Sequence, residues 1–147
     1  KTTARRVVLQ LSEEEFLIRK ELGKVWRISC NKEHFYNHTI KISYNLEKIY
    51  LSNVIEAIYK IVPNARAIIL FGSYRKGDDT EESDIDIAVE VSDGQFKIVE
   101  IPENWSFGFR ENVKVNLHIF SRNKIDLNLF SNIANGIVLE GFLEVKI

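Results

Sequence analysis

The sequence predicts an α/β (α+β) fold in which a mixed, twisted β-sheet is flanked by helices. Residues 67–71 form a continuous apolar run, which is typical of a central buried strand. Residues 83–91 alternate between apolar and mostly acidic side chains, as expected for a second strand with two different faces. Between residues 43 and 62, apolar side chains recur every three or four positions, which predicts one long amphipathic helix that stops at Pro63.

Further elements are predicted on either side of these three. Residues 2–11 predict the end of a helix, and two short strands, 15–19 and 24–29, follow with a tight turn at Gly23. The remaining predictions are strands at 95–101 and 114–120, a helix at 126–135 that Gly136 ends, and a closing pair of strands in 137–147. We therefore expect a first segment, 1–42, and a domain, 43–147.

The composition is that of a globular protein, with 45% apolar and 28% charged residues. No apolar run reaches the roughly 20 residues of a membrane span, and the first residues do not resemble a signal peptide, so we expect no membrane partner. The single cysteine, Cys30, excludes an internal disulfide, which favours a cytoplasmic location. The chain opens at Lys1 and contains no methionine, so we expect a fragment.

Charge is distributed unevenly along the chain. Residues 1–60 hold 11 Lys and Arg against 7 Asp and Glu, whereas residues 61–147 hold 9 against 14. A basic first part favours contact with an anionic polymer, and ordinary surface variation is the alternative interpretation.

A bend suited to binding phosphate follows the predicted central strand. The strand leads directly into Gly72-Ser73, at an edge of the sheet where α/β proteins usually bind ligands. Glycine lets the backbone approach an anion closely, and a helix that begins here would add the positive end of its dipole. Arg75 and Lys76 supply positive charge nearby.

Two acidic residues follow this bend. Asp84 and Asp86 lie two positions apart, so a strand places both carboxylates on one face. Two like charges so close repel each other unless a divalent cation neutralises them, and Mg²⁺ also bridges carboxylates to substrate phosphates. Metal-assisted nucleotidyl transfer requires this combination. For the acidic pair taken alone, a solvated strand face is the alternative.

The spacing of these groups resembles a known signature. Gly72-Ser73, ten intervening residues, Asp84 and then Asp86 are similar to the GS-x10-D-x-D pattern of the DNA polymerase beta superfamily, in its minimal nucleotidyltransferase branch. The resemblance implies that Asp84 and Asp86 are catalytic residues that bind Mg²⁺. It also implies that Gly72 and Ser73 contact the phosphates of a nucleoside triphosphate, with ATP expected. Lys76 stands where many relatives have arginine and is assigned to nucleotide binding.

One departure from this family bears on catalysis. Relatives supply a third carboxylate from a later strand, in a pattern like V-D-L, and the best match here is 115–117, with Asn116 in the carboxylate's place. Asparagine does not deprotonate a hydroxyl and holds a second metal ion poorly. His118 shares the face of Asn116 and is an alternative base, although a structural histidine is the simpler interpretation. Glu90 and Glu111 are other candidates for the third carboxylate.

Residues 1–30 resemble the last part of a winged helix-turn-helix, namely the end of a recognition helix and a two-stranded wing. The arrangement of the whole chain is similar to that of archaeal-type proteins in which such a module precedes a minimal nucleotidyltransferase domain. The resemblance implies DNA contacts that weaken steeply with added salt. The residues assigned to these contacts are Arg5, Arg6, Lys24 and Arg27. The alternative is that the hairpin packs on the long helix or mediates homodimerisation.

Three functional hypotheses follow. The first is a Mg²⁺-dependent nucleotidyltransferase that moves a nucleoside monophosphate to a hydroxyl, for example on a partner protein. Resemblance to the minimal branch implies that this partner is a small helical toxin or nuclease, with the chain as antitoxin. The second is a DNA-binding transcriptional regulator in which the transferase fold serves as a nucleotide sensor. A protein-interaction module is a third.

Overall fold

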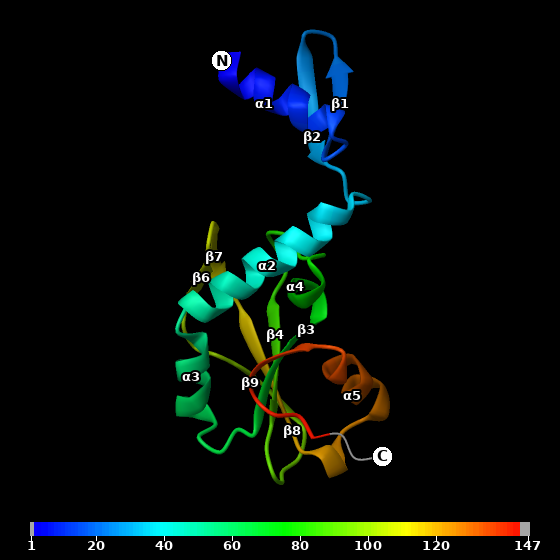
Figure 1. Cartoon of the computed structure of the whole chain (residues 1–147). Helices are drawn as coiled ribbons and strands as arrows, with labels where there is room; N and C mark the ends of the chain where they lie inside the picture. Colours follow the sequence, from blue (N-terminus) through cyan, green and yellow to red (C-terminus); the bar gives the residue numbers. More distant parts are fainter. Residues whose placement is uncertain (1, 145–147) are drawn as a thin grey trace. The chain divides into compact units, whose positions relative to one another are not determined.

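A computed structural model describes residues 2–144 of the chain, which divides into two compact units with the boundary between residues 41 and 42. Figure 1 shows the order of the helices and strands. They are α1 (Thr2–Glu13), β1 (Leu17–Leu22), β2 (Val25–Cys30), α2 (Phe35–Leu51), α3 (Val54–Ile61), β3 (Ala67–Phe71), α4 (Gly72–Lys76), β4 (Ile85–Glu90), β5 (Lys97–Glu100), β6 (Trp105–Phe107), β7 (Arg110–Val113), β8 (Val115–Phe120), a 3₁₀ turn η1 (Arg122–Lys124), α5 (Leu127–Ala134) and β9 (Ile137–Gly141). Among residues 2–144, no helix combines the length and the apolar character that a membrane span would need.

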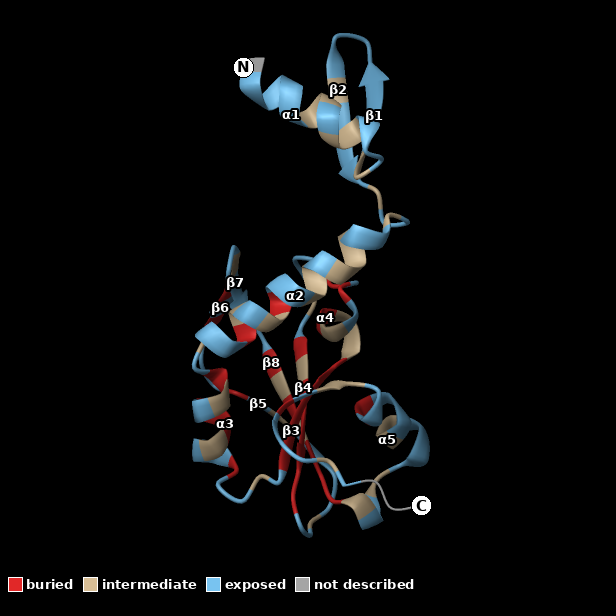
Figure 2. Cartoon of the chain, viewed as in Figure 1, coloured by how far each residue is buried: buried red, intermediate tan, exposed pale blue. Residues whose placement is uncertain are grey.

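The first unit holds α1 and an antiparallel hairpin of β1 and β2. The strands extend to Leu22 and Val25, which pair directly across a two-residue turn at Gly23 and Lys24. Gly23 has φ +61°, a left-handed conformation that glycine adopts without a steric penalty. No residue from 3 to 41 is buried (Figure 2), so this unit has no core of its own in the described part of the chain.

The prediction of one long helix over residues 43–62 is wrong in two respects. The structure has two helices, and the first begins at Phe35, eight residues earlier than predicted. Between the helices, Asn53 adopts a left-handed conformation with φ +60°, which asparagine tolerates better than most residues. The apolar pattern runs through the break because Ile49 and Val54, on either side of it, are both fully buried in the same core.

The second unit is built on a mixed sheet, as predicted. In the described residues five strands form it, in the order β5-β8-β4-β3-β9. Strands β4 and β8 run parallel, whereas the β3–β4, β3–β9 and β5–β8 pairs are antiparallel. Strand β3 is buried along its whole length, which agrees with its continuous apolar sequence.

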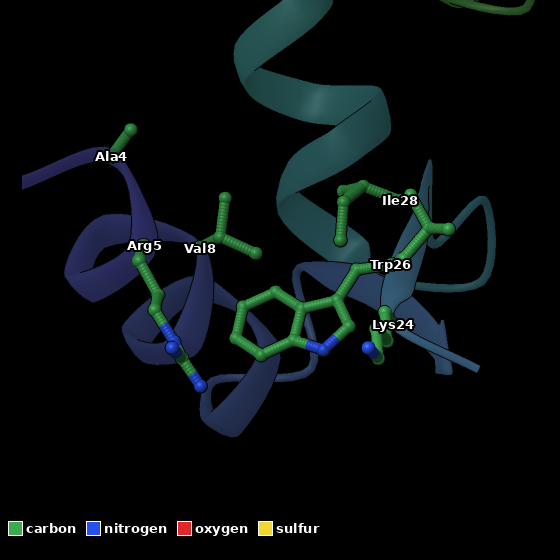
Figure 3. Close-up of a pocket in the computed structure, with 7 residues that line it drawn as sticks. Ala4, Arg5, Val8, Lys24, Trp26 and Ile28 are labelled. Carbon is green, nitrogen blue, oxygen red and sulfur yellow. The ribbon is translucent and has the colours of Figure 1, made fainter. Parts of the chain in front are cut away.

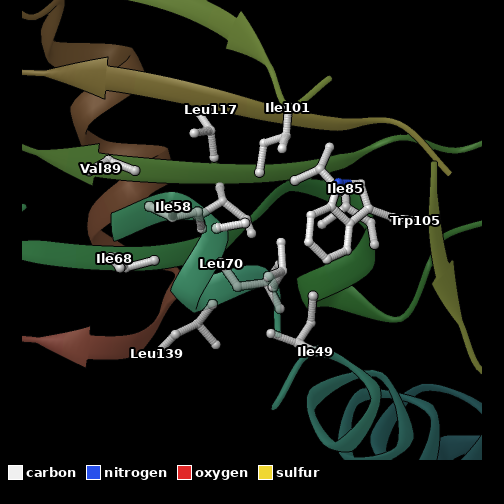
Figure 4. Packing of buried hydrophobic residues seen from close by; sticks show 14 of the residues in the cluster. Ile49, Ile58, Ile68, Leu70, Ile85, Val89, Ile101, Trp105, Leu117 and Leu139 are labelled. Carbon is white, nitrogen blue, oxygen red and sulfur yellow. The ribbon is translucent and has the colours of Figure 1, made fainter. Parts of the chain in front are cut away.

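The sheet has an apolar core on each face. The larger core lies under α2 and α3 and takes Ile85, Ile87 and Val89 from β4, which Figure 4 shows in part. The smaller core lies under α5 and takes Ala88 from β4 and Phe71 from β3. The predicted alternation in residues 83–91 is therefore confirmed, because neighbouring β4 residues enter different cores.

Two further differences from the sequence predictions concern strands. The hairpin of β6 and β7 was not predicted, although Trp105 and Phe107 of β6 are buried in the larger core. The tail predicted as a pair of strands contains one strand, β9, which pairs with β3. Residues 145–147 of that tail lie outside the described residues.

Candidate functional site

The Gly-Ser bend begins where β3 ends. Gly72 has φ +75° and starts α4, a single helical turn, and Gly77 ends that turn with φ +74°. The backbone N–H of Asp78 donates to the carbonyl of Ser73 at 3.1 Å, which closes the bend. Residues that carry a side chain rarely adopt such φ values, so glycine at both positions sets the path of this segment.

The two acidic residues lie on the face of the sheet that carries α5. Asp86 follows the buried Ile85 and precedes Ile87, both of which enter the opposite core. Strand register sets Asp86 directly opposite Phe71, the residue before the bend. Asp84 is exposed just before β4 begins. The carboxylates therefore lie at the end of the sheet where β3 turns into α4.

The carboxylate of Asp86 lies beside the bend. A Cβ atom added to Gly72 would lie 3.0 Å from Oδ2 of Asp86, closer than such atoms normally approach. Absence of a side chain at Gly72 thus leaves room for this carboxylate against the backbone. A polyanion held by the bend would lie beside a negative charge, so the arrangement needs a cation between them.

Two side chains from β8 hold one oxygen of each carboxylate. The amide Nδ2 of Asn116 donates to Oδ2 of Asp84 at 3.3 Å, and Nε2 of His118 lies 2.9 Å from Oδ1 of Asp86. Because an ionised carboxylate only accepts hydrogen bonds, His118 donates through Nε2. The ring also packs edge-on against Phe71, with centroids 4.9 Å apart. His118 therefore orients Asp86, and its Nε2 is already engaged.

The remaining oxygens match the preference of a hard divalent cation. Oδ1 of Asp84 and Oδ2 of Asp86 have no side-chain partner among residues 2–144. The same residues contain no group of three or more His, Cys, Asp or Glu side chains that would form a closed metal cage. Two carboxylates fit Mg²⁺, which usually takes one or two carboxylates and completes its shell with phosphates and water.

Of the other acidic candidates, Glu90 lies at the far end of the sheet from these carboxylates, whereas Glu111 follows Arg110, which donates to the carbonyl of Ser83. Glu90 is the last residue of β4, 1% exposed, and its Oε1 lies 2.9 Å from Nη2 of Arg122. It pairs in register with Ala67, the first residue of β3, and so lies at the far end from the bend. Glu111 is exposed on β7.

A polar cavity of about 370 Å³ opens beside the bend. Lys76, predicted to bind nucleotide, lines it together with Gly72. Arg75, predicted to supply positive charge near the bend, also lines it, as do Asn132 and Asn135, which were not predicted. The two asparagines follow Gly72 by about 60 residues, and no local pattern links them to it.

A buried polar network anchors the loop between α4 and β4, and it was not predicted from the sequence. Asp79, whose side chain is 3% exposed, accepts from Nδ2 of Asn45 at 2.9 Å and lies 3.5 Å from Nη1 of Arg110. Arg110 also donates to the carbonyl of Ser83, the residue before Asp84. Helix α2 and strand β7 thereby position the loop that carries Asp84.

The predicted DNA contacts are only partly brought together within the first unit. Arg5 and Lys24 line a cavity of about 410 Å³ between α1 and the hairpin, with Trp26 at its centre (Figure 3). The guanidinium of Arg5 lies 4.8 Å from the Trp26 ring centroid. Arg6 and Arg27 are exposed and do not line this cavity.

Comparison with known proteins concerns mainly the second unit. The model of the family described as "Polymerase beta, Nucleotidyltransferase" matches residues 53–140, from just before α3 to β9. A Methanocaldococcus jannaschii protein named "Putative protein adenylyltransferase" is 55% identical over 31 residues, which are 21% of this chain and 31% of that protein. The chain thus spans less than a third of the length of this relative. The family match covers more than half of the chain and includes the Gly-Ser bend and both aspartates, so the chain belongs to the polymerase beta nucleotidyltransferase family.

Proposed function

We propose that this protein is a Mg²⁺-dependent nucleotidyltransferase that moves a nucleoside monophosphate from a nucleoside triphosphate to a hydroxyl on a partner protein. The position of the Asp86 carboxylate, in the space that a side chain at Gly72 would need, carries the proposal, because it sets a carboxylate beside a bend suited to phosphate. In the reaction, a bond forms between the hydroxyl oxygen and the α-phosphorus. The α–β phosphoanhydride bond breaks, pyrophosphate leaves, and the hydroxyl proton passes to water.

Each residue of the site has one task in this proposal. Asp84 and Asp86 would hold Mg²⁺, and the ion when bound would neutralise charge on the polyphosphate. Gly72 and Ser73 offer backbone N–H groups and a hydroxyl to the phosphates, and Lys76 adds a positive charge. Helix α4 is a single turn, so we assign the phosphate contacts to these local donors.

The proposed acceptor is a protein. The name of the Methanocaldococcus jannaschii relative, an adenylyltransferase acting on protein, supports this choice over a small molecule. Resemblance to the minimal branch of the family suggests a helical toxin-type partner, which would make the chain an antitoxin.

A second candidate function rests on Asn116. With an amide in place of the third carboxylate, the site has no obvious base for the acceptor hydroxyl, and His118 is engaged with Asp86. In this alternative the fold binds a nucleotide without transferring it, and the first unit binds DNA through Arg5 and Lys24. The protein would then be a nucleotide-sensing regulator.

One experiment separates these functions. The purified chain is incubated with Mg²⁺, ATP labelled at the α-phosphate and candidate partner proteins. Label in protein that disappears in Asp84→Ala and Asp86→Ala supports transfer, and Asp93→Ala, an exposed aspartate after β4, is the matched control. Nucleotide binding without transfer, with salt-sensitive binding of duplex DNA, supports the regulator. If neither nucleotide nor DNA binds, both proposals fail and a protein-interaction module remains.

A further inference from the structure

We propose that the cavity beside Gly72 receives the nucleoside of the triphosphate and that Asn132 contacts its base; this inference rests on the proposed function. Two segments far apart in sequence form the cavity, whose lining residues are Phe71, Gly72, Arg75, Lys76, Asn132 and Asn135. Its volume of about 370 Å³ lies near the lower end of the roughly 300–1,000 Å³ that small-molecule sites occupy. None of the roles assigned above uses the asparagines.

The two walls of the cavity differ in charge. Arg75 and Lys76, at the end of α4, bring two cations to the wall that contains Gly72, next to Asp86. The opposite wall, at the end of α5, brings two neutral amides. Phosphates are stabilised beside the cations and the bend. The amide wall is therefore left for the uncharged end of the substrate, which is the nucleoside.

The hydrogen bonding of Asn135 supports a nucleoside over a polyphosphate. Its Nδ2 donates to the carbonyl of Ser131 at 2.8 Å. Because a carbonyl oxygen only accepts, the amide nitrogen must be the atom that faces Ser131, and the Oδ1 of Asn135 remains as an acceptor. A polyphosphate offers acceptors and no donors at neutral pH. Ribose hydroxyls and base amines offer donors, so the acceptor on Asn135 suits a nucleoside.

Asn132 offers the free amide that can contact the base. Its side chain is exposed and makes no hydrogen bond to any residue between 2 and 144. An asparagine amide presents one donor and one acceptor side by side. This pair complements the amine and adjacent ring nitrogen of adenine and, with the amide turned over, the carbonyl and adjacent N–H of guanine. An aspartate at this position would only accept, which suits the two neighbouring N–H groups of guanine instead.

The test is a change of base preference in the full chain. Affinities for Mg²⁺–ATP and Mg²⁺–GTP are measured by calorimetry for the wild-type protein, for Asn132→Asp and for Asn128→Asp. Asn128 lies one turn earlier on α5, does not line the cavity and carries the same change of charge. We expect Asn132→Asp to lower the ratio of ATP to GTP affinity by about tenfold or more, as a lost bidentate contact does. Asn128→Asp should leave the ratio unchanged.

Three outcomes overturn the inference, and they are distinguishable. If Asn132→Asp and Asn128→Asp weaken both nucleotides equally, charge alone acts and Asn132 does not contact the base. If Asn132→Asp leaves the affinities for both nucleotides unchanged, Asn132 does not contact the base. If it binds no triphosphate, the proposed function fails as well. Nucleotide binding with the expected switch but without label transfer would support this inference and overturn only the proposed transfer.

Discussion

Replacing Asn116 by aspartate tests whether β8 contributes to a metal site. In the wild-type protein its Nδ2 donates to Oδ2 of Asp84 at 3.3 Å. In Asn116→Asp this hydrogen bond is lost, and a third carboxylate lies beside Asp84 and Asp86. Without a cation the three charges repel one another. With a divalent cation the same charges become ligands, so the variant should depend on metal far more than the wild-type protein.

The short distance between residue 116 and Asp84 sets the size of the expected loss in stability. Two unit charges about 4 Å apart repel by about 1 kcal/mol in water and by about 4 kcal/mol at an effective dielectric constant of about 20. Asp84 is exposed, so the lower value applies, and the lost hydrogen bond adds about 1 kcal/mol. The variant should therefore lose about 2 kcal/mol of unfolding free energy in EDTA. For a unit of about 100 residues this lowers Tm by roughly 8 °C.

The assay is thermal unfolding in EDTA and at increasing Mg²⁺ or Mn²⁺. We expect the ions to restore the Tm of Asn116→Asp and to raise the wild-type Tm much less. Asn123→Asp on η1, which follows the opposite end of β8, has the same change of charge and should show neither effect. The reasoning would be refuted by a variant that is as stable as wild type in EDTA, or that divalent ions stabilise no more than wild type.

Three further predictions follow from the contacts. Gly72→Ala adds about 1–2 kcal/mol of left-handed strain and a Cβ 3.0 Å from Oδ2 of Asp86, so Mg²⁺-dependent nucleotide binding measured by calorimetry should be lost. Arg122→Ala leaves the buried Glu90 without its cation and should cost about 3 kcal/mol in urea unfolding. The proposed phosphate contact of Arg5 predicts that Arg5→Ala weakens binding of duplex DNA and lowers its logarithmic salt slope by about 1.

Matched variants control each of these. Gly23→Ala introduces the same strain at φ +61° with open space around the new Cβ, so nucleotide binding should persist. The double variant Glu90→Leu/Arg122→Met removes both charges of the buried pair and should regain most of the stability; if it does not, packing explains the loss. Arg19→Ala removes another guanidinium from Trp26, at 4.5 Å, and should leave the salt slope unchanged. An equal effect of the Arg5 and Arg19 changes would contradict a DNA contact by Arg5.

Much of the fold follows from short-range patterns in the sequence. Residues 67–71 predicted a buried central strand because a strand covered on both faces needs apolar side chains throughout. The period of two in residues 83–91 predicted which β4 side chains share a face of the sheet. By contrast, the break at Asn53 was hidden because both helices bury their apolar stripes against one face of the sheet.

By itself, the sequence determined the components of the site: the glycine that permits a left-handed bend, the cations after it and two aspartates two positions apart. These are local properties, set by backbone sterics and by the geometry of a strand. Only the tertiary structure decided which groups face one another. The antiparallel β3–β4 register brings Asp86 against Gly72, the parallel β4–β8 pairing brings Asn116 to Asp84, and α5 lines the cavity beside the bend. Contacts between residues tens of positions apart depend on how the sheet is assembled, and no local pattern encodes them.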